Sequence, residues 1–378
     1  MKEGKAYRIV ILGGYGHFGG RIAKALASHR DLHLLIAGRS MAAASGFVAG
    51  LGSTAAAHEA VQLDHASPDF ELALRRLDAD LLIHTCGPFQ GQDTHVAESC
   101  IATRTHYVDL ADARDFVCGF TRLDGSARAK GVLLITGAST LPAVSSCVID
   151  EIAKQYATLQ EVRISIAPGQ RTPRGLATIE AILSYCGRPF RRLEAGRWIT
   201  VYGWQDIRRI DYPQLGQRWM ASCDVPDLAL FPERYAGVAT VNFHAALELS
   251  ALQWGMWLMA WLARAGLVND WSRHARLVKR LADRFDRFGS DVGGMQIELT
   301  GIGVNGCARR TAWFLLAANG HGPEIPCIPA IVMAQKLARG DIAVRGAQPC
   351  MGLMSLRDFE NAVRHLDITC KISELSAQ

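Results

Sequence analysis

Between residues 6 and 137, apolar runs of strand length alternate with amphipathic stretches of helix length. The runs are YRIVILGG, LHLLIAGRS, AAAHEAVQLD, ADLLIHTCGPF, THYVDLAD and VLLITGAS. Nearly continuous apolar character is typical of strands buried on both faces of a parallel sheet, and parallel strands need crossovers between them. The alternation therefore predicts an α/β domain, a doubly wound parallel sheet of Rossmann type.

The pattern changes after GASTLPAVSS to longer and more polar strands, such as EVRISIAPGQ, ATVNFHAALEL and GMQIELTGIG. These predict a second, α+β domain built on a mixed or antiparallel sheet. The expected domains are residues 1–140, 141–345 and a C-terminal helical segment 346–378, whose packing on the first domain is left open. Ser355, with Asp358 three residues later, predicts the start of the final helix.

The stretch GGYGHFGG lies between the first strand and the first helix, which is the context of a dinucleotide-binding loop. Gly14 would permit the tight turn, Gly16 would let the backbone approach the pyrophosphate, and Gly19 would let the helix pack closely on the strand. The helix N-terminus offers free N–H groups to phosphates. Tyr15, His17 and Phe18 complete the predicted cofactor-binding loop.

The second strand ends in AGRS, and Arg39 occupies the position where an NAD enzyme carries an acidic residue. An arginine beside Ser40 suits a 2′-phosphate, so the sequence predicts NADP. Asp64, after the third strand, is expected either near the adenine or as a cap of the following turn.

The carboxyl ends of the fourth and fifth strands should carry the chemistry, because ligands bind at that edge of such sheets. Cys86, Gly87, Pro88 and Phe89 are expected along the nicotinamide ribose. Asp109 is the expected proton-transfer group, with His84 and Asp112 as alternatives at the same edge, and both aspartates could instead be helix caps.

Composition excludes several classes of function. The net charge of +5 is spread along the chain, so nucleic acid is not an expected partner and a small molecule is. Ten cysteines without a C-x-x-C pair indicate buried thiols in a reducing compartment, with no metal site. The start MKEGKAYRIV lacks the pattern of a signal peptide, which predicts a cytoplasmic protein.

The segment ALELSALQWGMWLMAWLARAGLV is long and rich in Trp and Met, but Glu248, Gln253 and Arg264 interrupt it. Its uninterrupted part is too short to span a bilayer. A buried helix or a subunit interface is favoured over a membrane-surface helix, because Lys and Arg do not line an opposite face of this segment.

GGYGHFGG, AGRS, CGPF and HYVDLAD, in this order and spacing, resemble the NADP-binding domain of the saccharopine dehydrogenase-like family. That family includes saccharopine reductases, lysine 6-dehydrogenases and carboxyspermidine-type dehydrogenases. The resemblance covers about the first 140 residues; later segments such as GRWITVYGW and GPEIPCIPAIVMAQKLARG resemble bacterial members without an assigned substrate. It implies hydride transfer between NADP(H) and the carbon of a C–N or C=N bond, and a homodimer built through the second domain.

One departure from the family concerns lysine. No lysine lies between Lys24 and Lys130, so the Lys/Asp arrangement of true saccharopine reductases is not evident and the substrate stays open.

Two pairs of residues in the second domain could have a functional role. Arg171 and Arg174 could hold a substrate carboxylate, although surface arginines of loops are commoner. His244 and Glu248 lie four residues apart and would share a helix face if FHAALELS were helical, most simply as a structural pair.

Two other functions compete with an NADP-dependent oxidoreductase. Short-chain dehydrogenases need a Y-x-x-x-K pair, which the sequence lacks. A non-catalytic NADP-binding sensor or scaffold is the alternative that the sequence leaves standing.

Overall fold

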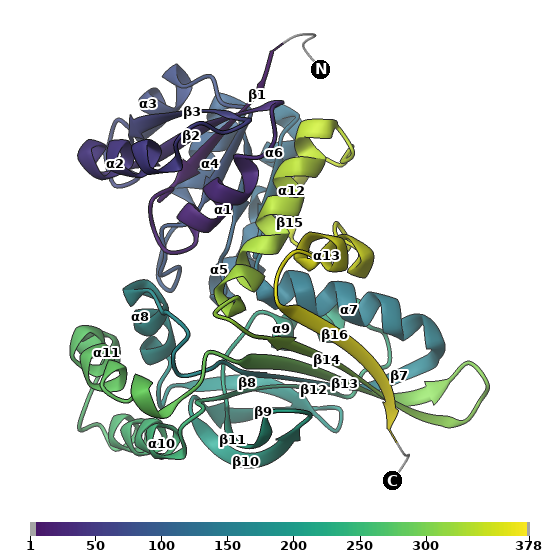
Figure 1. Cartoon of the computed structure of the whole chain (residues 1–378). Coiled ribbons are helices and arrows are strands. Elements are labelled where there is room, and N and C mark those ends of the chain that lie inside the picture. Colours follow the sequence, from purple (N-terminus) through teal and green to yellow (C-terminus); the bar gives the residue numbers. More distant parts are fainter. Residues whose placement is uncertain (1–4, 376–378) are drawn as a thin grey trace. The chain divides into compact units, whose positions relative to one another are not determined.

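The computed structural model describes residues 5–375, and the chain folds into two compact units (Figure 1). The first unit comprises Met1–Val144 and Glu324–Met354, and the second comprises Ser145–Pro323 and Ser355–Gln378. Met1 to Gly4, on which the expectation about a targeting segment partly rests, lie outside the described residues.

The first unit is a seven-stranded, wholly parallel sheet in the order β15-β6-β5-β4-β1-β2-β3, which confirms the predicted doubly wound domain. Its strands are β1 (Tyr7–Leu12), β2 (Leu32–Gly38), β3 (Ala57–Gln62), β4 (Leu81–His84), β5 (His106–Asp109), β6 (Leu133–Thr136) and β15 (Gly346–Pro349). Its helices are α1 (Gly19–Leu26), α2 (Met41–Leu51), α3 (Phe70–Arg76), α4 (His95–Thr103), α5 (Arg114–Gly119), α6 (Asp124–Lys130) and α12 (Ile328–Arg339).

Burial follows the place of each strand in this sheet. The inner strands β4 and β6 are buried at every residue, whereas the edge strand β3 is half-buried or exposed throughout. Helices α1 and α12 pack against each other, although residues 27–327 separate them in sequence (Figure 1). Because strands buried on both faces need apolar residues at each position, the sequence pattern identified them.

The second unit contains a seven-stranded mixed sheet in the order β10-β11-β12-β7-β13-β14-β16, which confirms the predicted α+β character. The β12–β7 pair is parallel and the other pairs are antiparallel. The strands are β7 (Tyr156–Ala167), β10 (Gln205–Tyr212), β11 (Gly216–Ser222), β12 (Thr240–Ala246), β13 (Gly293–Gly303), β14 (Ala308–Ala317) and β16 (Ile368–Leu375), with a separate hairpin of β8 (Pro189–Glu194) and β9 (Arg197–Tyr202).

The helices of the second unit are α7 (Ser145–Ile152), α8 (Leu176–Ser184), α9 (Asp227–Arg234), α10 (Ser250–Arg264), α11 (Ala275–Asp283) and α13 (Leu356–Val363). Ser355 and Asp358 form a capping box at the start of α13, as predicted. Helix α13 packs on α7, within the second unit.

The units divide the chain differently from the expected boundaries. Residues 324–354 return to the first unit, because β15 pairs with β6 and α12 packs on α1. The remaining C-terminal residues belong to the second unit, because β16 pairs with β14. The expected segment 346–378 is therefore shared between the two units.

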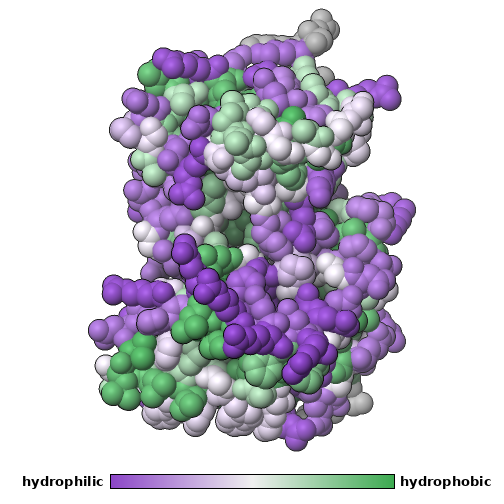
Figure 2. All heavy atoms as spheres, turned by 60° about the vertical axis from the view of Figure 1, so that its left-hand side comes forward, coloured by the Kyte–Doolittle hydropathy of each residue, from purple (hydrophilic) through white to green (hydrophobic). Residues whose placement is uncertain are grey.

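The Trp/Met-rich segment forms α10, and no helix among residues 5–375 is long and apolar enough to cross a membrane. Several of its large side chains are exposed rather than buried. Apolar surface is visible in Figure 2 on the side of the molecule where Figure 1 places α10 and α11.

Candidate cofactor and active site

The glycine loop joins β1 to α1 at the carboxyl edge of the sheet. The backbone N–H groups of Gly13 and Gly14 both donate to the carbonyl of Ala37, at 2.8 and 3.0 Å, and tie the loop to β2. The left-handed backbone conformation is at Gly13, with φ of 82°, and not at Gly14, where the sequence motif predicted the turn. Gly13 is thus a part of the loop that the motif did not single out.

Two of the three motif glycines are required by a close approach of the backbone. A Cβ on Gly14 would lie 2.7 Å from the carbonyl oxygen of Ile11, and one on Gly19 would clash with the carbonyl of Gly13. A Cβ on Gly16 would meet only the Gly13 carbonyl oxygen, at 3.0 Å, and Gly16 is exposed. Its backbone is therefore open to a ligand.

His17 and Phe18 lead from the loop into α1. Arg21 donates to the carbonyl of His17 at 2.6 Å and forms an ion pair with Glu324 at 3.0 Å. The carbonyl of Phe18 accepts from the thiol of Cys327 at 3.7 Å. The returning segment around Glu324 thereby holds the start of the helix in place.

The end of β2 carries the two residues assigned to the 2′-phosphate. Arg39 and Ser40 are both exposed, and the side chain of Arg39 has no ion-pair partner within residues 5–375. The N–H of Ser40 donates to the hydroxyl of Tyr15 at 3.1 Å, and the Ser40 side chain caps α2 by accepting from Ala43 N. Tyr15 also lies against Gly38, where any Cβ would meet its ring at 2.5 Å.

Asp64 follows β3 and closes a short turn. Its Oδ1 accepts from the N–H of Ala66 at 3.1 Å, which is the capping arrangement that the sequence left as an alternative. The neighbouring His65 was not predicted as part of the site, because no local pattern marks it.

The CGPF turn follows β4 and is held by a residue that no sequence motif marked. Gln92 donates from Nε2 to the carbonyls of Cys86 and Pro88, at 2.8 and 2.6 Å. The ring of Phe89 is buried against His84 and Phe116, at centroid distances of 5.1 and 5.3 Å. Phe89 thus anchors the turn from inside the domain.

Cys86 and Thr85 contact the glycine loop. Thr85 donates to the carbonyl of Leu12 at 2.8 Å, and a Cβ on Gly13 would meet Thr85 Oγ1 and Cys86 Sγ at 2.7 and 2.9 Å. Burial raises the pKa of the Cys86 thiol to about 11, so this thiol is neutral at physiological pH. Thr85 also lies outside the predicted set.

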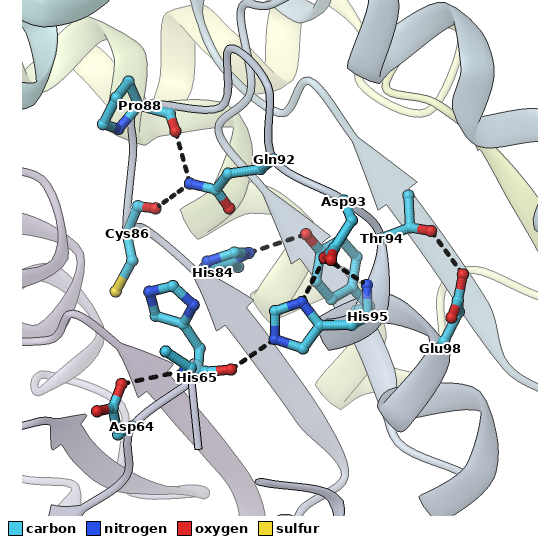
Figure 3. A network of polar contacts seen from close by, with 12 residues as sticks. Asp64, His65, His84, Cys86, Pro88, Gln92, Asp93, Thr94, His95 and Glu98 are labelled. Carbon is cyan, nitrogen blue, oxygen red and sulfur yellow. Dashed lines mark hydrogen bonds and ion pairs between the residues drawn. The ribbon is translucent and has the colours of Figure 1, made fainter. Parts of the chain in front are cut away.

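Three histidines gather beside this turn (Figure 3). The ring centroid of His65 lies 5.8 Å from that of His84 and 6.0 Å from that of His95. His95 contacts the Asp93 carboxylate through Nδ1 and the carbonyl of His65 through Nε2, the latter at 2.5 Å. Burial opposes its charge, but these two acceptors raise the pKa of His95 above its usual value.

His84, one of the three proposed proton-transfer groups, is 1% exposed. Its Nδ1 lies 3.1 Å from the Tyr107 hydroxyl. Burial, together with His65 and His95, lowers the pKa of His84 to about 3. The ring is therefore neutral at physiological pH.

Asp109 is fully buried at the end of β5. Its Oδ1 accepts from Thr136 Oγ1 at 3.0 Å, from Gly137 N at 2.8 Å and from Ala111 N at 2.9 Å. Burial raises the pKa of this carboxyl to about 6, although the three donors act in the opposite direction. Asp109 thus joins the ends of β5 and β6 into one turn.

Asp112, three residues further on, is exposed. Its Oδ1 accepts from Gln90 Nε2 at 3.2 Å, and Gln90 belongs to the loop that follows the CGPF turn. The protein atoms that surround the carboxyl displace part of its water and raise its pKa above the usual value, although solvent still reaches the residue. Of the three proposed proton-transfer groups, Asp112 is the one that solvent reaches.

The two arginines of the second unit differ in their surroundings. Arg174 donates from Nη2 to the carbonyl of Gly169 at 3.0 Å and so supports its own loop. Arg171 is exposed, and its guanidinium has no ion-pair partner within the described chain. Its backbone N–H donates to Ser290 O at 2.8 Å.

His244 and Glu248 do not share a helix face, because His244 lies on β12 between β7 and β11. Glu248 accepts from the N–H groups of Gln170 and Ser290, at 2.7 and 2.8 Å. The alternation of VNFHA places large apolar residues on one face of a strand. Pairing with β7 and β11 on both sides favours the strand over a helix.

The second unit also holds an ionic cluster around a buried arginine, which no sequence pattern indicated. Arg192 is 2% exposed and contacts Glu194 at 2.6 Å, Asp206 at 2.9 Å and Ser222 Oγ at 2.7 Å. The cluster ties the β8–β9 hairpin to the main sheet. No group of three or more His, Cys, Asp or Glu within residues 5–375 is arranged to hold a metal ion.

The first unit fits a dinucleotide on its own geometry. The exposed backbone of Gly16 permits close approach of a pyrophosphate, and the unpaired guanidinium of Arg39 is suited to the 2′-phosphate.

The comparisons with known proteins agree with that fit. Residues 9–139 match the family model described as the saccharopine dehydrogenase NADP-binding domain. No curated protein matches the chain in sequence.

Among solved structures, the apo histidine-tagged saccharopine dehydrogenase (L-Glu forming) of Saccharomyces cerevisiae is 14% identical, with a TM-score of 0.68. This match covers 98% of the present chain and 100% of the yeast chain. An amine dehydrogenase of Mycobacterium smegmatis is 12% identical over 93% of this chain and 96% of its own, with a TM-score of 0.47. The fold of the chain is thus similar to that of the yeast enzyme, and residues 9–139 are similar to saccharopine dehydrogenase NADP-binding domains.

Proposed function

We propose that the protein is an NADP-dependent oxidoreductase acting on the carbon of a C–N or C=N bond in an amino acid or an amine-derived substrate. The observation that carries the proposal is the combination of an NADP-binding domain with the fold of a saccharopine dehydrogenase over 98% of the chain. Fold alone does not fix a reaction, so the residues of the site supply the rest of the argument.

The first unit offers a complete set of groups for holding the cofactor. Arg39 and Ser40 would bind the 2′-phosphate, and the Gly13–Gly19 loop would receive the pyrophosphate at the start of α1. The turn from Cys86 to Pro88, fixed by Gln92, would face the nicotinamide ribose with its backbone. When bound, the cofactor supplies or accepts the hydride.

A proton-transfer group must reach the substrate. Asp112 is exposed, whereas Asp109 and His84 are 0% and 1% exposed. We therefore assign proton transfer to Asp112, and to Asp109 the positioning of the turn that carries it. A carboxylate at this edge stabilises the cationic C=N group, which is the better hydride acceptor, and relays its proton.

Arg171 is the candidate for binding a substrate carboxylate. A guanidinium without an acidic partner binds a carboxylate in a bidentate fashion, so an amino acid or keto acid is the expected substrate. Arg174, which is engaged by its own loop, would support that segment rather than bind directly.

The test is NADPH oxidation with a panel of keto acids and amines, and NADP⁺ reduction with amino acids. Asp112→Asn should lower turnover by about a hundredfold or more while NADPH affinity stays unchanged. Asp115→Asn, on the neighbouring α5, is the matched control and should keep wild-type turnover. Tight NADPH binding without turnover on any substrate would contradict the proposed enzyme activity and support the alternative, a non-catalytic NADP sensor.

The homodimer expected from the sequence, built through the second domain, is likewise a proposal.

A further inference from the structure

An ordinary surface helix buries its large apolar side chains and exposes its polar ones. Helix α11 instead exposes its large apolar side chains. It buries Ala275 and half-buries Val278 and Ala282, whereas Leu277 and Leu281 are 56% and 46% exposed. The stripe continues beyond the helix end with Phe285 and Phe288, which are 38% and 61% exposed. The large apolar side chains of this segment therefore face solvent.

Helix α10 also exposes large apolar side chains. Trp254, Leu258 and Trp261 are 41%, 54% and 42% exposed, and Leu267, after the helix, is 72% exposed. The tryptophans form a row, because Trp257 lies between Trp254 and Trp261 with ring centroids 5.5 and 6.0 Å away. We call the exposed residues of 254–288 the α10–α11 face; Figure 2 shows apolar and polar surface side by side on that side of the molecule.

The same face is strongly basic. Residues 250–288 contain seven Lys and Arg and three Asp, a net charge of +4 within a chain whose total is +5. Two of the aspartates pair with their own neighbours, Asp283 with Lys279 at 2.8 Å and Asp270 with Arg273 at 3.8 Å. The positive charge of the face is thus left uncompensated.

Three arginines are free to act on a partner. Arg276, Arg280 and Arg284 are exposed and, within the described chain, have no acidic group in ion-pair distance. They alternate with Leu277 and Leu281 along α11 and its C-cap, Arg284, so basic and apolar groups lie next to each other. Aromatic and Leu side chains bordered by Arg are the composition of a helix that lies in a membrane interface.

We propose that the α10–α11 face docks the protein on the surface of an anionic lipid bilayer. The leucines and aromatic rings would enter the boundary between headgroups and acyl chains, and the arginines would bind the lipid phosphates. Helix α10 spans 15 residues and does not cross the bilayer.

The charge of the face decides against a second copy of this chain. In a two-fold dimer the same patch meets itself, so an uncompensated basic stripe faces an identical one. Like charges brought together in an interface oppose association, whereas an anionic surface attracts them.

The experiment is co-sedimentation of the full-length protein with vesicles of phosphatidylcholine alone or of phosphatidylcholine with phosphatidylglycerol. Wild-type protein should bind the anionic vesicles, bind the neutral ones far less, and dissociate as salt is raised. Arg280→Glu and Arg284→Glu should each weaken binding roughly fivefold or more. Arg76→Glu, at an exposed position of α3 in the first unit, is the matched control and should bind as wild type.

A second pair of variants separates the apolar contribution. Leu281→Ser should weaken binding to anionic vesicles, whereas Leu72→Ser, at a position 49% exposed on α3, should not. Emission from exposed Trp254 and Trp261 should shift to the blue when anionic vesicles are added, and NADPH binding should be the same in all variants, as a check of folding.

Two results would overturn the proposal. One is the absence of binding to anionic vesicles at low salt. The other is a dimer in sedimentation equilibrium that Leu281→Ser dissociates and Leu72→Ser does not, together with no vesicle binding; the face would then be an interface between copies.

Discussion

At the scale of single residues, the choice of nucleotide depends on Arg39. Its guanidinium is exposed and unpaired beside Ser40, at the end of β2. Removing one charge-assisted phosphate contact costs about 1.5 to 3 kcal/mol. Arg39→Ala should therefore weaken NADPH binding by about ten- to a hundredfold and leave NADH binding unchanged, measured by calorimetry.

Arg30→Ala, at another exposed arginine of the same unit, is the control for Arg39→Ala and should bind both nucleotides as wild type. Equal affinity of the wild-type protein for NADPH and NADH would contradict the assignment.

The carboxyl of Asp109 should make the free energy of unfolding depend on pH. Burial raises the pKa of its carboxyl from an ordinary value of 3.8 to about 6 in the folded state, so folding takes up protons between these values. The contribution of this carboxyl to the free energy of unfolding should thus fall by about 2 kcal/mol as pH rises from about 4 to 6.

Asp109→Asn should flatten that dependence, because the amide oxygen still accepts hydrogen bonds and carries no charge. Urea unfolding across this pH range is the measurement, with Asp69→Asn at an exposed position as control. An unchanged slope in Asp109→Asn would show that the carboxyl does not titrate there.

The sequence identified the glycine loop and Arg39, because a motif of fixed spacing marks them. It placed the turn at Gly14, whereas the left-handed residue is Gly13, and two adjacent glycines offer no local means of choosing between them. The gathering of His65, His84 and His95 was out of reach, because it depends on how the ends of β3 and β4 meet the start of α4.

At the scale of elements, the start of α13 is the clearest case of a local sequence signal that forms as predicted. The Ser355 side chain accepts from Asp358 N at 3.1 Å, and Asp358 Oδ2 accepts from Ser355 N at 2.9 Å. Ser355→Ala should lower the free energy of unfolding by about 1 kcal/mol, measured by chemical denaturation.

Ser355→Asn should restore most of that stability, since asparagine caps a helix as well as serine does. Equal losses in the two variants would mean that the capping hydrogen bond does not contribute.

Strands that are buried on both faces could be predicted from composition, and β1, β2, β4 and β6 were. Strand β12 was also predicted, from ATVNFHAALEL; the helical alternative for FHAALELS is excluded by the pairing of β12 with β7 and β11. Strand β15, with the sequence GAQP, has no strand pattern at all. Its edge position explains why a proline is tolerated there.

At the scale of the whole molecule, the proposed homodimer is tested by sedimentation equilibrium without lipid. A dimer at micromolar concentration that persists in Leu281→Ser would support contact through the strands of the second unit. A wild-type monomer under these conditions would refute the dimer. It would not bear on the lipid proposal, which is tested by vesicle co-sedimentation.

The order of the two folds along the chain was predicted, but not the return of residues 324–354 to the first unit. The predictive signals were local, and the return depends on contacts between segments some two hundred residues apart, as in the pairing of β15 with β6.

That return has a consequence for biosynthesis. The ribosome delivers the first six strands of the parallel sheet early, but the strand that covers β6 follows only after all of residues 145–323 have been made. Until then β6 is an unprotected edge, able to pair with foreign strands. The domain that is translated first is therefore completed nearly last, and a nascent chain stalled before Gly346 exposes an edge that chaperones and proteases can recognise.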